Sequence, residues 1–215
     1  FGSALVEKDG DYALSPHSVT AFSEPYGLLK TASAQGHINA MMDSDGILRH
    51  HLLYLDMPDG RRIPSLALAV ARKYPEGAVT EPPVSSQGFW YLPFCGQPGD
   101  IEEISIADVL SGAVSPEYFN GKIVLIGPYA AGLQDSYMTA IDHARPMYGV
   151  EYQANAIQAL LWGEYKQEVS DGIQLVILFF LLWAGFMAFR KFRVRVSALL
   201  WLGMSGGFVL FCAVL

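Results

Sequence analysis

Several features that mark common functional classes are missing from this 215-residue sequence. The turn after the apolar run at 122–126 has neither the spacing of a phosphate-binding G-x-x-x-x-G-K-[ST] loop nor that of a G-x-G-x-x-G fingerprint. Ser65 and Ser136 lack the G-x-S-x-G context of an activated nucleophile. Two cysteines, Cys95 and Cys212, are too few for a disulfide framework. We therefore expect a core held by packing and no catalytic site in this chain.

Metal ligands with a recognisable spacing are also missing. The sequence has five histidines, and His50 and His51 would point to opposite faces of a strand. The stretch Asp43-Ser44-Asp45-Gly46 resembles the start of a calcium loop but lacks the later ligands and the closing glutamate. It reads instead as a tight turn between two extended segments. We predict no metal and no cofactor.

Charge is unevenly distributed along the chain. All 21 acidic residues precede Ile173, together with ten of the 14 basic residues, which gives residues 1–172 a net charge of −11. Such an acidic region disfavours nucleic acid and anionic lipid as partners. The four remaining basic residues, Arg190, Lys191, Arg193 and Arg195, fall between two apolar stretches.

These two apolar stretches, 173–189 and 196–215, carry no charged residue. A membrane helix needs about 20 apolar residues, with a lower limit of about 17, so both stretches are predicted to span a membrane. The basic loop 190–195 is then cytoplasmic by the positive-inside rule, and residues 1–171 lie outside the cytoplasm. We expect a multi-pass protein of the plasma (inner) membrane. The start at Phe1 and the end at Leu215 lead us to expect a fragment of a longer receptor.

The most informative stretch runs from Asn120 to Leu161. Residues 122–126, Lys-Ile-Val-Leu-Ile, are bounded by glycines and predict a strand buried on both faces, as in a parallel sheet. A glycine-containing turn and a polar loop follow, and then a helical pattern begins near Gly149. Such alternation of strands and helices predicts an α/β fold. Ligands of open α/β sheets bind beyond the carboxyl ends of the strands.

Four polar residues of this stretch are candidates for a ligand site: Asp135, Thr139, Glu151 and Asn155. The alternative role is structural, with Asp135 and Thr139 capping a turn or helix and Glu151 favoured by the helix dipole in the first turn. Both roles place the four residues close together, because the loop after the strand leads into the helix that carries Glu151 and Asn155.

The order of short motifs in this stretch resembles the CHASE2 domain family. The similarity rests on Gly121–Gly127, Gly132, Asp135, Thr139, Met147, Gly149–Glu151, Ala154–Asn155 and Leu160–Leu161. Upstream motifs, Gly36–Asn39, Asp43–Arg49, Pro64–Ala67 and Ala107–Gly112, extend it over roughly residues 36–163. The resemblance implies an α/β extracytoplasmic sensor head over 1–170, with a central mixed or parallel sheet flanked by helices, followed by transmembrane helices.

The resemblance also implies a function. Members of this family are sensor modules of bacterial transmembrane signalling proteins, joined by membrane helices to a cytoplasmic output domain. We expect a nucleotide cyclase as the output first and a sensor kinase second, with a homodimer as the assembled form. The stimulus, a small molecule or a protein, is not readable from the sequence. The alternative is an extracytoplasmic dimerisation or docking module with no small-molecule ligand, which an exposed apolar patch would favour.

Overall fold

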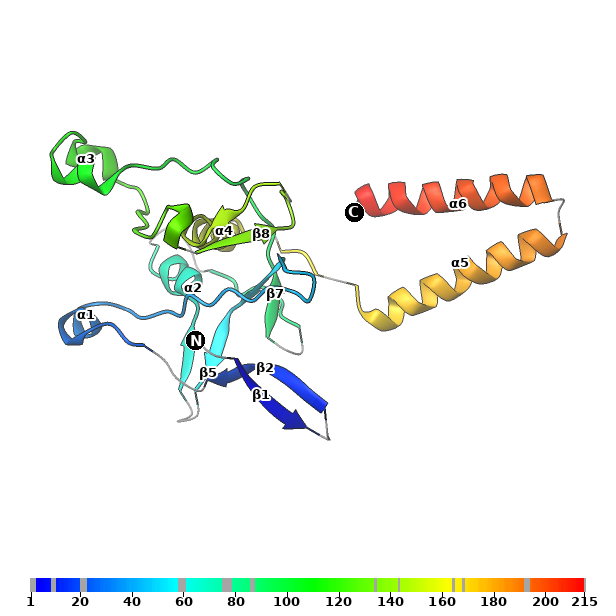
Figure 1. The fold of residues 1–215 in the computed structure, drawn as a ribbon, viewed down its shortest axis with the longest axis horizontal. Coiled ribbons are helices and arrows are strands. Elements are labelled where there is room, and N and C mark those ends of the chain that lie inside the picture. Colours follow the sequence, from blue (N-terminus) through cyan, green and yellow to red (C-terminus); the bar gives the residue numbers. More distant parts are fainter. Residues whose placement is uncertain are drawn as a thin grey trace. The chain divides into compact units, whose positions relative to one another are not determined.

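The computed structural model in Figure 1 describes residues 3–8, 11–19, 23–57, 61–74, 79–85, 88–133, 135–142, 144–163, 165–167, 169–191 and 194–214. The chain forms two compact units, Phe1–Gln167 and Glu168–Leu215. The first unit, called the head below, is a mixed α/β structure. The second consists of two long helices. Each unit is described by itself.

The sheets of the head are small. The three-stranded sheet is mixed, because β8 pairs in parallel with β3 and antiparallel with β9. Three antiparallel pairs, β1–β2, β4–β7 and β5–β6, accompany it. The strands are β1 (Ser3–Lys8), β2 (Asp11–Val19), β3 (Ile47–Leu48), β4 (His50–Leu52), β5 (Tyr54–Asp56), β6 (Arg62–Pro64), β7 (Phe89–Tyr91), β8 (Ser136–Thr139) and β9 (Met147–Tyr148).

Two helices of the head begin at serine N-caps. Ser65 caps α2 (Leu66–Ala71) by accepting a hydrogen bond from the Leu68 amide, and Ser105 caps α3 (Ile106–Leu110) through the Ala107 amide. Helix α4 (Gly149–Trp162) begins where the sequence predicts a helix and ends at Gly163, whose φ of 70° suits glycine. The others are α1 (Gly27–Ala32) and the short 3-10 helices η1 (Pro116–Phe119) and η2 (Ala131–Leu133).

The core of the head lies where α2 and α4 pack together with strands β3 and β7. Its largest fully buried side chains are aromatic or long aliphatic, and include Trp90, Tyr152, Leu48, Leu68 and Met147. The buried face of α4 carries Tyr152, Ala156 and Leu160 together with Glu151 and Asn155, so an expected apolar face through Val150 and Ala154 is wrong: these two residues line a groove instead. This buried cluster fixes α4 in place, and the candidate residues Glu151 and Asn155 are fixed with it.

The strand predicted at 122–126 is not formed, and this prediction is wrong. The structure assigns no strand there, and no described segment pairs with it. Leu125 packs partly against the core, but Val124 is 50% exposed and Ile126 85% exposed. The mixed sheet of the head is therefore the small one formed by β3, β8 and β9, and residues 122–126 are not part of it. The physical reason is that a strand needs a neighbour, and none of the described strands lies beside these residues.

The turn predicted at Asp43–Gly46 is confirmed. The Gly46 amide donates to the Asp43 carbonyl at 2.9 Å, and Gly46 has a φ of 81°. A second reversal suggested by Asp59-Gly60 lies outside the described residues. The extended segment before the Asp43 turn does not pair with β3, because His37 forms an isolated parallel bridge with Ser65 instead.

The second unit contains α5 (Asp171–Lys191) and α6 (Val194–Val214), which contact each other. Gly185 allows a close approach, since a Cβ there would lie 3.2 Å from Cδ1 of Trp201. In the part of the chain that the structure describes, no helix meets the length and hydropathy needed to cross a membrane. The spans predicted over 173–189 and 196–215 are therefore not confirmed.

Candidate functional site

Glu151 holds the start of helix α4. One of its carboxylate oxygens, Oε2, accepts from the Tyr148 amide at 3.2 Å. The other, Oε1, accepts from the Gly99 amide at 2.7 Å. An acidic side chain at this position is stabilised by the helix dipole, and the buried Glu151 carboxylate also replaces its lost water by two amide donors. It therefore ties the loop around Gly99 to the first turn of α4.

Asn155, one turn later, holds the neighbouring part of the same loop. Its Oδ1 accepts from the amides of Cys95 and Gly96, both at 2.9 Å. Its Nδ2 donates to the Glu151 carbonyl at 3.1 Å and contacts the Met147 sulfur at 3.6 Å. Asn155 is buried and both of its polar atoms have partners. These contacts are those of a residue that fixes a loop on a helix.

Asp135 lies against the first residue of α4. Its backbone carbonyl accepts from the Gly149 amide at 2.9 Å. Its carboxylate leaves no room for a side chain at position 149, because a Cβ there would lie 2.3 Å from Oδ1. Burial raises the pKa of Tyr137, and the negative charge of Asp135 and a hydrogen bond to it raise this pKa further.

Thr139 stands apart from the other three candidates. It ends β8 opposite Leu48 of β3, is fully buried, and its hydroxyl has no hydrogen-bond partner among the described residues. Thr139 is four residues after Asp135 along extended chain. At about 3.3 Å per residue, the two residues lie roughly 13 Å apart. The structure thus gathers Asp135, Glu151 and Asn155 near the start of α4 and separates Thr139 from them.

A groove with a volume of about 960 Å³ runs along the outer side of α4. Val150, Glu151 and Ala154 form its wall on the helix. The opposite wall is mostly apolar and comes from three segments: 101–109, 118–119 and 122–129. Gly127 lets the last of these approach the helix, since a Cβ on it would lie 2.9 Å from Cβ of Val150. A cavity of this size, apolar with a few polar groups, is typical of binding sites.

Tyr129 lines the groove together with the acidic residues Glu103 and Glu151. Burial raises the pKa of Tyr129 to about 12, with further contributions from the negative charges of Glu151 and Glu103, while the positive charge of Arg145 opposes them. The Tyr129 ring lies 4.2 Å from that of Tyr148. The sequence analysis missed Glu103, Tyr129 and Arg145, because they come from separate segments and form no motif.

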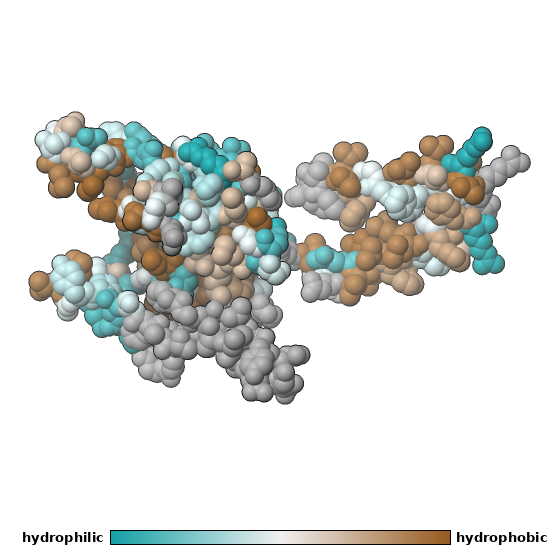
Figure 2. Space-filling model, in the orientation of Figure 1, coloured by the Kyte–Doolittle hydropathy of each residue, from teal (hydrophilic) through white to brown (hydrophobic). Residues whose placement is uncertain are grey.

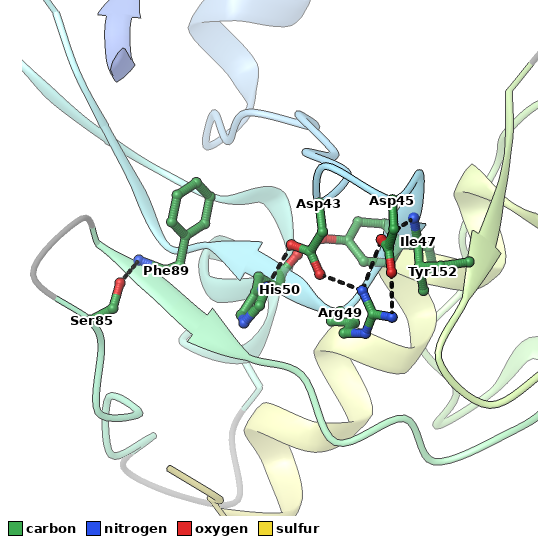
Figure 3. A network of polar contacts seen from close by, with 8 residues as sticks. All are labelled: Asp43, Asp45, Ile47, Arg49, His50, Ser85, Phe89 and Tyr152. Carbon is green, nitrogen blue, oxygen red and sulfur yellow. Dashed lines mark hydrogen bonds and ion pairs between the residues drawn. The ribbon is translucent and has the colours of Figure 1, made fainter. Parts of the chain in front are cut away.

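The acidic turn before β3 is closed by an arginine (Figure 3). Arg49 makes two hydrogen bonds to the Asp45 carboxylate, at 3.0 and 2.7 Å, and a third to Asp43 at 2.8 Å. The other oxygen of Asp43 lies 2.9 Å from Nδ1 of His50. The Arg49 contact lowers the pKa of Asp45 to about 2. These carboxylates therefore stabilise the turn. Among the described residues, no group of three or more potential ligands could hold a metal ion.

Two histidines are buried in the head, and one of them, His51, contacts the inner side of α4. His51 is fully buried, with its Nδ1 2.5 Å from the hydroxyl of Tyr152 and its ring edge-on to Trp90. His37 is 6% exposed. Burial lowers the pKa of His37 to about 4 and that of His51 to about 3, so both are neutral in the folded head at pH 7.

The site thus consists of a helix hydrogen-bonded to a loop on one side, with an open, mostly apolar groove on the other. The groove is a candidate site for binding, and the described residues show no catalytic constellation. The CHASE2 domain family matches residues 4–189, and the chain belongs to this family. CHASE2 domains are extracytoplasmic sensors of membrane signalling proteins and are not catalytic. No curated protein and no solved structure gives a significant match.

Proposed function

We propose that this chain is the sensor region of a bacterial transmembrane receptor, which passes a stimulus received by the head to a cytoplasmic output domain. The observation that carries the proposal is the position of α4. This helix forms one wall of the groove through Val150, Glu151 and Ala154, and it is followed in the sequence by α5. A stimulus that shifts α4 would therefore act on the start of α5 through a short stretch of chain.

The same proposal places α5 and α6 in the membrane, with 190–195 on the cytoplasmic side. It is supported by the uncharged sequence of 173–189 and 196–215 and by large apolar side chains that lie exposed on both helices, among them Leu175, Phe179, Leu199 and Leu210. Exposed apolar surface of this extent is costly in water and favourable in lipid (Figure 2).

Labelling of intact cells tests this placement. In a background with Cys95 and Cys212 replaced by serine, we would introduce one cysteine at a time, Ser111→Cys in the head or Arg190→Cys at the end of α5. Both positions are exposed. An impermeant maleimide should label Cys at 111 on intact cells and Cys at 190 only after permeabilisation. Labelling of both positions on intact cells would contradict the orientation.

A stimulus bound in the groove would contact α4 directly. Of the four candidates Asp135, Thr139, Glu151 and Asn155, Glu151 lines the groove, and Asp135 and Asn155 fix the helix and loop beside it. Ala154→Trp would fill the groove from the helix side, with Ser111→Trp on the exposed surface as the control. In the full-length receptor, Ala154→Trp should change the output severalfold, whereas Ser111→Trp should leave it unchanged. Equal outputs from both would contradict signalling through the groove.

For the output domain we rank a nucleotide cyclase first and a sensor kinase second, as the family resemblance suggests. Cyclic nucleotide formation by the full-length receptor would support the first. Autophosphorylation without cyclic nucleotide would favour the second.

The second candidate function is a docking module without a small-molecule ligand. The exposed apolar side chains at 123–126, which form part of the groove wall, favour it, because exposed apolar surface is typical of protein interaction sites. Both functions use the same face of α4, and they differ in what occupies it.

A further inference from the structure

A row of ring side chains crosses the core of the head and ends in the stretch of chain that follows α4. Its members are, in order, Tyr137, Tyr152, His51, Trp90 and Tyr165, and they are termed the ring row. The ring centroids lie 6.3, 5.4, 6.1 and 5.8 Å apart from one member to the next. Rings attract one another at such distances, and a close-packed interior transmits the displacement of one side chain to its neighbours.

The last member of the ring row, Tyr165, lies in the short stretch between α4 and α5. It is half-buried, its ring meets that of Trp90 at 90°, and its hydroxyl donates to the carbonyl of Thr80. Helix α4 ends at Trp162 and α5 begins at Asp171, so few residues separate Tyr165 from either helix. The contacts of Tyr165 therefore determine where the chain leaves the head on its way to α5.

His51 is the member of the ring row that titrates closest to neutral pH. It is fully buried, and its Nδ1 lies 2.5 Å from the Tyr152 hydroxyl. Its Nε2 has no hydrogen-bond partner among the described residues, and neither has Nε1 of Trp90. Protonation puts a hydrogen on both ring nitrogens. A protonated His51 would therefore bury a charge together with a donor that has no acceptor, which is costly.

The groups around His51 do not compensate a positive charge. The ring meets the Tyr152 hydroxyl from α4, the Trp90 indole from β7 and the ring of His37, a second buried histidine. Tyr137 follows behind Tyr152 in the ring row. A charge on His37 would repel one on His51, and no carboxylate among the described residues raises the pKa of His51. Acid therefore favours any arrangement in which the His51 ring leaves the row and reaches water.

The size of this effect follows from two pKa values. In the closed arrangement, with the ring row intact, burial lowers the pKa of His51 to about 3, whereas a histidine in water has a pKa of about 6.5. Below pH 6.5 the open arrangement therefore binds a proton that the closed one does not. Between pH 7 and pH 5 the ratio of open to closed chains rises roughly 25-fold. If about 1% of the chains are open at pH 7, about 20% are open at pH 5.

We propose that the proton is a stimulus of this head: a ring nitrogen of His51 takes a proton from the solvent, the ring leaves the row, and Trp90 and Tyr165 shift and move the start of α5. This inference rests on the sensor function proposed above, because it needs a head exposed to the external pH and an output that follows α5. It does not use the groove, so it adds a second input to the same helix.

The distance between two spin labels tests the movement. The full chain, purified in mild detergent with Cys95 and Cys212 replaced by serine, would carry Lys73→Cys just after α2 and Gln167→Cys after Tyr165, both at exposed positions. Double electron–electron resonance should show one population of distances at pH 7 and a second, displaced one at pH 5. Near-UV circular dichroism should stay native at both pH values.

Histidine variants test where the proton binds. His51→Phe keeps a ring in the row but takes no proton, so the second population should be absent at pH 5. His51→Gln serves the same purpose if the phenylalanine variant does not fold. His50→Phe is the matched control on the same strand, β4, and should keep the second population. Tyr165→Leu removes the last ring, so the distances should no longer depend on pH although unfolding still does.

Three results on the purified chain would overturn the proposal. These are equal distances in the parent chain at pH 7 and pH 5, an equal change in the His51→Phe chain, and a loss of the near-UV signal in step with the second population, which would mean acid unfolding. In the full-length receptor, the output should change severalfold between external pH 7 and pH 5, and His51→Phe should abolish this change. A chain that moves on protonation without a change in output would contradict the sensor function and leave the proton site of His51 established.

Discussion

Helix α4 has two sides of opposite character. On the inner side, Tyr152 is packed in the core, and the two polar atoms of Asn155 are hydrogen-bonded to the loop at Cys95–Gly96. On the outer side, Val150 and Ala154 face a groove whose other wall includes residues 123–127, which make no backbone hydrogen bond with another residue that the structure describes. One helix thus has an inner side that is buried in the core and an outer side that borders an open groove.

For the sensor function proposed above, this difference separates the contacts that hold α4 from the surface that a stimulus would meet. Contacts on the inner side set the position of α4, and binding on the outer side can change its position only by as much as the binding free energy differs between the two arrangements.

The largest expected effect on stability is that of Asn155→Ala. The change leaves the amides of Cys95 and Gly96 without their acceptor. At about 1–3 kcal/mol for each unpaired buried group, the free energy of unfolding should fall by roughly 2–6 kcal/mol. Urea unfolding of the chain in mild detergent, followed by near-UV circular dichroism, measures this loss.

The control for this variant lies on the same helix. Gln158 is exposed, and Gln158→Ala should change the free energy of unfolding by less than about 0.5 kcal/mol. If Asn155→Ala were as mild as Gln158→Ala, the inner side of α4 would not be the rigid side, and Asn155 would again be available for a ligand.

Acid should weaken the inner side by a similar amount. His37 and His51 have pKa values of about 4 and 3 in the folded head, below the ordinary 6.5. Below pH 6.5 the unfolded chain therefore binds protons that the folded chain does not, and stability falls as the pH falls towards these values. Between pH 7 and pH 5, the two residues together should cost about 3–4 kcal/mol.

The part of this loss in unfolding free energy that comes from the two histidines can be measured separately from the part that comes from other titratable groups. His51→Phe keeps an aromatic ring next to Trp90 but does not titrate, and it should remove about half of the pH-dependent change measured by urea unfolding at the two pH values. A double variant, His37→Gln with His51→Phe, should remove most of it. A loss as large in the double variant as in the parent chain would mean that other groups cause the acid sensitivity.

Gly149, the first residue of α4, lies against the Asp135 carboxylate, and a substitution there tests this contact. An alanine here places its Cβ against the Asp135 carboxylate, so either the helix start or the loop at Asp135 must move. Overpacking of this kind costs about 1–3 kcal/mol, partly offset by the better helix propensity of alanine. Gly132→Ala is the control, because no atom lies within 4 Å of a Cβ at that position. Thermal unfolding should distinguish the two variants.

From the sequence, the start of α4 could be predicted better than the groove on its outer side. Helix starts depend on local signals, so the start of α4 near Gly149 was predicted, and the structural role considered for Glu151 matches its contact with the Tyr148 amide. Residues 122–126 have the composition of a buried strand, but a strand forms only beside a neighbour, and that neighbour is often far away in the sequence. For the same reason, the grouping of Glu103, Tyr129 and Arg145 could not be predicted from local patterns.

Thr139→Val should have the smallest effect, and it tests whether the candidate farthest from α4 has a structural or a binding role. The Thr139 hydroxyl is buried without a partner among the described residues, which is a cost to the folded state. Valine has nearly the same shape and no hydroxyl, so the variant should be as stable as the parent chain or more stable by up to about 1 kcal/mol. Thr139→Ser, which keeps the hydroxyl and loses the methyl group, should instead be less stable by about 1 kcal/mol because it leaves a small cavity. Urea unfolding gives the stability of both variants, and the output of the full-length receptor gives their signalling. If the hydroxyl binds a stimulus, Thr139→Val should lower the response to that stimulus, and Thr139→Ser should preserve it. The more stable variant would then give the weaker response. If the hydroxyl is only a buried defect, the response should follow stability, and Thr139 should be removed from the candidate site.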